Sequence, residues 1–166
     1  MIIGQIGTHL DLILLWGLAA TVVMTTILQG SQQIGWSRLS LPFLIGTIVT
    51  ERRPWATVLG YVFYTIGGWL FAFFYFALFR AIGTANWWLG AAAGLVHGGF
   101  LLTVFLTVLS YVHPRMATEY SGPDALRKLE PPGFLALHYG RRTPIITLVA
   151  QTIYGAILGA GFGTAI

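Results

Sequence analysis

Four long apolar runs constrain the fold of this chain more than any other feature of its sequence. They cover about residues 10–29, 55–79, 87–112 and 144–164. A helix needs about 20 consecutive apolar residues to cross the hydrocarbon core of a bilayer. The runs are also too long for membrane strands, and they lack the period-two alternation of such strands. The sequence therefore predicts an all-α fold, a bundle of four transmembrane helices.

The composition points the same way. Of the 166 residues, 56% are hydrophobic and only 8% are charged, whereas an average soluble domain has about 25% charged residues. We expect a single transmembrane domain over residues 1–166, with the lipid bilayer as a partner and no nucleic acid. The chain has no cysteine, which excludes disulfides, iron–sulfur clusters and thiolate zinc sites.

Basic residues predict the orientation of the four helices. Eight of the nine Lys and Arg residues fall in the first and third loops: Arg38, Arg52, Arg53, Arg115, Arg127, Lys128, Arg141 and Arg142. Arg80 alone belongs to the second loop. Because Lys and Arg accumulate on the cytoplasmic side, we expect loops 1–2 and 3–4 in the cytoplasm and both termini outside, in the inner (cytoplasmic) membrane. Arg52, Arg53, Arg141 and Arg142 are predicted to contact lipid phosphates or a partner.

Two segments outside the runs suggest further structure. The apolar stretch 39–49 is too short to span a bilayer, so we expect an interfacial or re-entrant segment there. The long loop 113–143 contains four prolines, which exclude a continuous helix. Its apolar residues near 134–139 suggest that it packs partly on the membrane surface.

The two halves of the chain resemble each other. Residues 17–24 align with 90–97, Phe43-Leu44 with Phe134-Leu135, and 65–68 with 152–155, and a double arginine precedes the second helix of each half. This order predicts a duplication of two helical hairpins, 10–80 and 86–164, related as a parallel repeat. Shared membrane composition is the alternative explanation.

Two rows of glycines predict close helix packing, as in a glycine zipper. The rows are spaced by four residues and comprise Gly90, Gly94 and Gly98, and Gly155, Gly159 and Gly163. Glycines at this spacing share one helix face and let two backbones approach closely. The rows are expected to join helices of the bundle itself, or alternatively to face another subunit or a second copy of the chain.

Few polar residues lie deep in the runs, and they are the candidates for an intramembrane site: His97, Gln151, Tyr154, Thr21 and Tyr64. His97 is ionisable, and such groups are costly inside a bilayer. It has three interpretations: a neutral imidazole bonded to Thr21, Gln151 or Tyr154, a proton or solute site, or a haem ligand paired with Met24. No cofactor or metal is predicted beyond this haem alternative.

Several local motifs resemble those of a group of small bacterial four-helix membrane proteins without an assigned activity. They are His113-Pro-Arg-Met, Glu130-Pro-Pro-Gly-Phe-Leu-Ala-Leu, Tyr139-Gly-Arg-Arg-Thr-Pro and Tyr154-Gly-Ala-Ile-Leu-Gly. The resemblance implies the four-helix fold and no activity. Some members carry His where this chain has Gln151, so the resemblance does not imply a site of two facing histidines here.

The spacings of the polar residues match no catalytic or metal-binding motif, and no catalytic residue is predicted. We therefore expect a non-catalytic packing or accessory subunit of a larger membrane assembly. A small-solute or proton transporter or channel with a site near His97 is the alternative. A haem-binding or enzymatic membrane protein ranks third.

Overall fold

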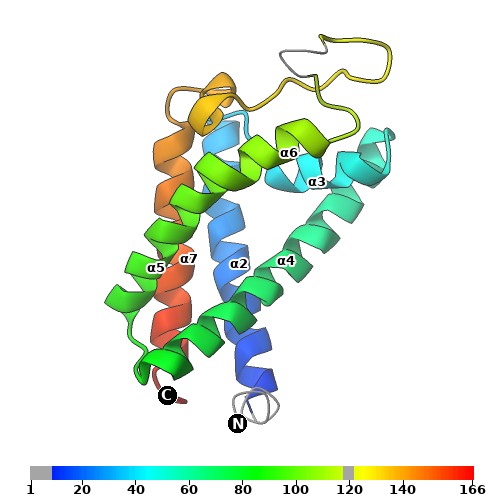
Figure 1. The fold of residues 1–166 in the computed structure, drawn as a ribbon. Helices are drawn as coiled ribbons and strands as arrows, with labels where there is room; N and C mark the ends of the chain where they lie inside the picture. Colours follow the sequence, from blue (N-terminus) through cyan, green and yellow to red (C-terminus); the bar gives the residue numbers. More distant parts are fainter. Residues whose placement is uncertain (1–8, 118–121) are drawn as a thin grey trace. The chain divides into compact units, whose positions relative to one another are not determined.

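A computed structural model describes residues 9–117 and 122–166 of the chain. Within them the chain is helical, and no strand is present apart from an isolated parallel bridge between Met116 and Leu129. The α-helices are α2 (Leu10–Gln33), α3 (Leu41–Val49), α4 (Arg53–Ile82), α5 (Trp87–Phe100), α6 (Leu106–Val112) and α7 (Thr143–Phe162), as Figure 1 shows. A π-helical segment, η1 (Leu101–Phe105), joins α5 to α6, and a short 3₁₀ segment, η2 (Phe134–Tyr139), precedes α7.

Four helices among the described residues are long and apolar enough to cross a membrane. They are Leu10–Gln33, Arg53–Ile82, Trp87–Val112 and Thr143–Phe162. The prediction of four candidate spans is therefore confirmed. The first two helices are longer than expected, because polar residues such as Gln32 and Arg53 continue the helical hydrogen bonding beyond the apolar core of each run.

The third span contains an irregularity that its sequence did not predict. At the end of η1 the backbone N–H of Leu106 bonds to the carbonyl of Leu101, five residues back. This pattern widens the helix by one residue, as π-bulges do. The residues of η1, Leu-Leu-Thr-Val-Phe, are ordinary helix and strand formers and carry no signal for it.

The described residues form two compact units. Unit 1 contains residues 9–27, 65–98 and 148–166, and unit 2 contains residues 28–64, 99–117 and 122–147. Each of the four long helices has one part in each unit. Unit 2 contains the loop residues 34–40, 50–52, 113–117, 122–133 and 140–142, whereas unit 1 contains the loop at 83–86. The predicted duplication of two hairpins stays a prediction.

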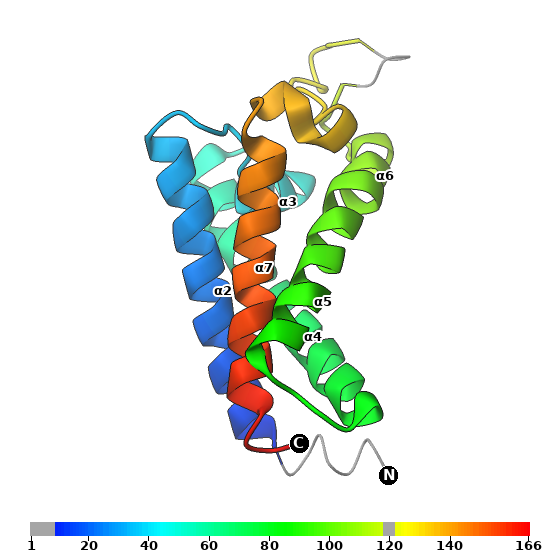
Figure 2. The ribbon, with the colours of Figure 1, turned by 90° about the vertical axis from the view of Figure 1, so that its left-hand side faces the viewer.

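Small residues let the helices of unit 1 approach closely. Gly17 of α2 lies against Trp69 and Ala72 of α4, and the Trp69 indole N–H donates to the Leu14 carbonyl at 3.0 Å. On α7, Gly161 lies against the Trp16 ring of α2. Figure 2 shows this part of α7 running beside α2 and α5. Helices in lipid do not gain hydrophobic energy by associating, so van der Waals contacts of this kind hold them together.

Unit 2 packs the short helix α3 directly on the start of α4. A Cβ built on Gly46 would lie 1.7 Å from the Ala56 carbonyl oxygen, and one on Gly60 would lie 1.9 Å from the Pro42 carbonyl oxygen. Only glycine fits at these two positions. The stretch 39–49 contains a nine-residue helix that begins after Ser40 and ends at Val49. Its expected role as an interfacial or re-entrant segment stays a prediction.

Candidate functional site

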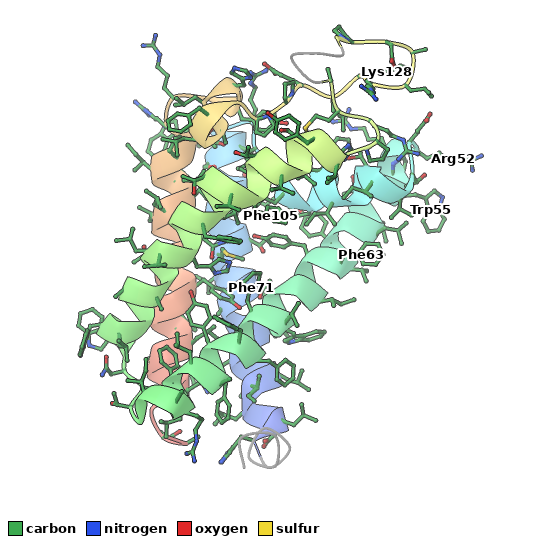
Figure 3. All side chains as sticks on the ribbon, viewed as in Figure 1. Arg52, Trp55, Phe63, Phe71, Phe105 and Lys128 are labelled. Carbon is green, nitrogen blue, oxygen red and sulfur yellow. The ribbon has the colours of Figure 1, made fainter. Side chains whose placement is uncertain are left out.

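The structure surrounds His97 with aromatic side chains in unit 1. Its ring centroid lies 4.0 Å from that of Phe71 and 6.2 Å from that of Tyr154. Its Nδ1 lies 3.5 Å from the Tyr75 hydroxyl, so Tyr75 is its hydrogen-bonding partner. Figure 3 labels Phe71 on α4. Sequence reasoning proposed Thr21, Gln151 or Tyr154 as partners and missed Tyr75, which stands in an aromatic run that offers no signal for this contact.

The other intramembrane candidates are bonded mostly to backbone. Thr21 donates to the Gly17 carbonyl at 2.7 Å, and Tyr154 donates to the Gly68 carbonyl at 2.6 Å. Gln151 is buried, and its Oε1 has no hydrogen-bonding partner among the described residues. Tyr64 is half-buried and belongs to unit 2. The described residues contain no group of three His, Asp or Glu side chains placed to hold a metal.

Both predicted glycine rows contribute to one helix crossing in unit 1. A Cβ built on Gly90 would lie 2.1 Å from the Gly155 oxygen, and the reverse distance is the same. Gly94 lies against the Gln151 backbone, and Gly159 lies against Asn86. At the ends of the rows, Gly98 lies near Leu148, and Gly163 is exposed. Gly90 and Gly94 of α5 therefore face Gly155 and Gly159 of α7.

Two residues that follow α6, His113 and Arg115, form hydrogen bonds with helix α3 in unit 2. The Nε2 of the buried His113 lies 3.0 Å from the Leu44 carbonyl oxygen and 3.2 Å from the Thr47 hydroxyl. The Arg115 guanidinium donates to the carbonyls of Thr47 and Ile48, at the end of α3. Cationic side chains commonly satisfy the last carbonyls of a helix in this way. The segment 113–117 and helix α3 are therefore joined by hydrogen bonds.

Arg38, in the loop that follows α2, connects this loop to the segment around η2 through hydrogen bonds and an ion pair. Its backbone N–H donates to the Tyr139 carbonyl at 2.7 Å, and its guanidinium donates to the His138 carbonyl. The same guanidinium pairs with Glu130 at 3.4 Å. The Tyr139 hydroxyl donates to the Glu130 carbonyl at 2.6 Å. Burial raises the pKa of Tyr139 to about 12, so this hydroxyl keeps its proton at neutral pH.

The η2 segment has an unusual backbone. Leu135 and Ala136 adopt left-handed conformations, with φ of 52° and 59°. A non-glycine residue in this region costs on the order of 1–3 kcal/mol, and such residues cluster at functional sites. The turn leaves two large apolar side chains exposed, Phe134 at 75% and Leu137 at 44%. We call residues 133–140 the η2 turn.

The four arginines predicted to contact phosphates or a partner are all exposed in unit 2: Arg52, Arg53, Arg141 and Arg142. Arg52 is labelled in Figure 3. The Arg142 guanidinium lies 4.8 Å from the centroid of the Trp36 ring, a cation–π distance. Arg141 and Arg142 directly follow the η2 turn, so the turn carries positive charge next to its exposed apolar side chains.

No protein-family model, curated protein or solved structure matches this chain. Its candidate function therefore rests on its own residues.

Proposed function

We propose that the chain is a non-catalytic accessory subunit of a larger membrane assembly, and that the η2 turn is its docking element. The observation that carries this proposal is the exposure of Phe134 and Leu137 on a strained turn. Both residues lie outside the four candidate spans. A few anchor side chains, often aromatic, that enter a partner's pocket supply most of the binding energy of an interface.

The surroundings of the turn support protein docking. Arg38, Tyr139 and Glu130 hold the turn in place, so binding would cost little ordering entropy. Arg141 and Arg142 favour a partner whose apolar pocket has an acidic rim. The positive-inside rule predicts that this face lies on the cytoplasmic side of the membrane. Around His97, contacts with Phe71 and Tyr75 favour a packing role over a central transport site.

Site-specific crosslinking in the native membrane tests this function. A photoreactive residue at 134 is expected to capture one protein, in fixed stoichiometry, that native mass spectrometry also finds bound to the unmodified chain. Leu126 is 66% exposed in the same loop and serves as the matched control position. The double substitution Phe134→Ala and Leu137→Ala should weaken the complex by at least about 2 kcal/mol, while Leu126→Ala should leave it intact.

Two results would contradict the accessory role. One is a chain that leaves its own membrane as a monomer without any bound protein. The other is a homo-oligomer that moves a solute across liposomes and loses this flux with His97→Ala, which would establish the transporter alternative.

A further inference from the structure

A cavity of about 500 Å³ opens in unit 2 beside helices α2, α3 and α4. Its polar lining comes from the end of α2, the segment before α3 and the first turns of α4: Gln29, Gln32, Arg38, Ser40, Arg53 and Thr57. Phe43 and Tyr61 complete the wall. The lining thus contains two guanidinium groups and no carboxylate, so the cavity attracts anions.

The neutral polar groups of the wall are held in place by the protein. The Gln29 amide donates to the Tyr61 hydroxyl, which links α2 to α4. The Gln32 amide donates to the Leu39 carbonyl at 2.8 Å. The Thr57 hydroxyl donates to the Arg53 carbonyl at 2.9 Å. These bonds fix the shape of the cavity and leave the two guanidinium groups as its charged donors.

Arg53 is available to a ligand, because its guanidinium has no ion pair among the described residues. Arg38 pairs with Glu130, but the two side chains are 67% and 49% exposed. Exposed ion pairs of this kind contribute little to stability. A phosphate group binds guanidinium bidentately and carries up to two charges, so it competes well for Arg38.

The start of α3 adds to the positive potential. Ser40 is the N-cap of this helix, its side chain does not cap the helix, and it lines the cavity together with Phe43 of the first turn. The N-terminus of a helix favours anions because its first N–H groups are unpaired.

An apolar surface lies beside the polar cavity. Trp55, Val58 and Val62 are exposed on α4. Val58 and Val62 directly follow the lining residues Thr57 and Tyr61, and consecutive residues are roughly 100° apart around a helix. An apolar flank of the span therefore borders the polar cavity. A phosphate ester with an acyl chain would contact the polar cavity with its phosphate and the apolar flank with its chain.

We propose that this cavity binds an anionic phosphate ester, held between Arg38 and Arg53. A phospholipid headgroup and a soluble phosphate ester share this chemistry. The cavity shares Arg38 with the contacts that hold the η2 turn, but binding of the ester does not require a protein partner.

Native mass spectrometry of the full chain in detergent tests the site. Phosphatidate is the lipid probe, phosphatidylcholine with the same acyl chains is the control lipid, and glycerol 3-phosphate is the soluble probe. Retention of one phosphatidate, but not of phosphatidylcholine, is expected. Arg53→Gln and Arg38→Gln should each weaken retention about tenfold, the effect of one charged hydrogen-bonding group.

Two further variants make the test specific. Arg52 is the exposed neighbour of Arg53 and does not line the cavity, so Arg52→Gln should weaken retention much less than Arg53→Gln. Glu130→Gln frees Arg38 from its ion pair and should strengthen retention several-fold. Binding of phosphatidate alone supports a lipid headgroup, whereas equal binding of glycerol 3-phosphate supports a soluble ester. If neither binds, or if Arg52→Gln weakens binding as much as Arg53→Gln, the proposal is wrong.

Discussion

The His113 imidazole joins the end of the third span to helix α3. Its Nδ1 accepts the Arg115 backbone N–H at 3.1 Å, so the proton of the neutral ring belongs on Nε2. From there it is donated to the Leu44 carbonyl at 3.0 Å, while the Thr47 hydroxyl donates to the same carbonyl. A single buried ring thus satisfies groups on two segments that are far apart in sequence. The neutral form is the one that this arrangement requires.

Protonation of His113 should therefore weaken unit 2. Burial lowers the pKa of His113 from its usual 6.5, the Arg115 charge lowers it further, and the hydrogen bond with Leu44 partly opposes them. Because the folded state binds the proton less well than the unfolded state, stability is complete above about pH 6.5 and falls as the pH decreases towards the folded pKa. Thermal unfolding of the purified chain at pH 8 and pH 5 measures this loss.

The substitution His113→Gln is the control, because glutamine offers a neutral donor that does not titrate. Its unfolding temperature should change less between pH 8 and pH 5 than that of the natural chain. His113→Ala removes the bond altogether and should cost about 1 kcal/mol at pH 8. An unchanged pH dependence in His113→Gln would show that other groups cause the acid sensitivity.

At the scale of elements, the crossing of α5 and α7 depends on the absence of side chains. Gly90 and Gly155 face each other so closely that a Cβ on either would overlap the other's carbonyl oxygen. Gly99, at the end of α5, has open space around its Cβ position. Glycines of one helix therefore differ in what they tolerate, although the sequence does not distinguish them.

Alanine substitution should separate the two kinds of glycine. Gly90→Ala forces the two backbones apart and should destabilise the chain by about 1–3 kcal/mol, the usual cost of overpacking. Gly99→Ala should be neutral or stabilise by up to about 1 kcal/mol, because alanine is the better helix former. Thermal unfolding in the same detergent compares the two variants. Equal effects would mean that the α5–α7 crossing does not limit stability.

The sequence predicts the long helices well because bilayer thickness sets their length. It does not predict η1, since the hydrogen-bond shift at Leu106 depends on packing rather than on residue type. Helix α3 was recognisable as an apolar segment, but not as a helix that Gly46 and Gly60 fit against α4. The partner of His97 and the role of Arg38 in a cavity both depend on contacts between distant segments, which a single sequence does not reveal.

At the scale of the whole molecule, the basic residues are distributed unevenly. Eight of the nine Lys and Arg residues belong to unit 2, and Arg80 alone belongs to unit 1. The η2 turn and the proposed phosphate cavity are both in unit 2. Both proposals therefore need the loops of unit 2 to lie on the side of the membrane that holds their partners. Orientation is the property that decides whether a cytoplasmic protein can reach the turn.

Cysteine labelling determines this orientation, because the natural chain contains no cysteine and each introduced thiol is unique. Suitable positions are exposed and leave every basic residue in place: Gln33, Ala125 and Thr84. In intact cells an impermeant maleimide should label Thr84→Cys, in the second loop, and should label Gln33→Cys and Ala125→Cys only after the membrane is permeabilised. This pattern follows from the excess of arginine and lysine around the first and third loops, which predicts that these loops lie on the cytoplasmic side. Labelling of position 125 in intact cells would put the η2 turn outside, and a cytoplasmic partner would then be excluded.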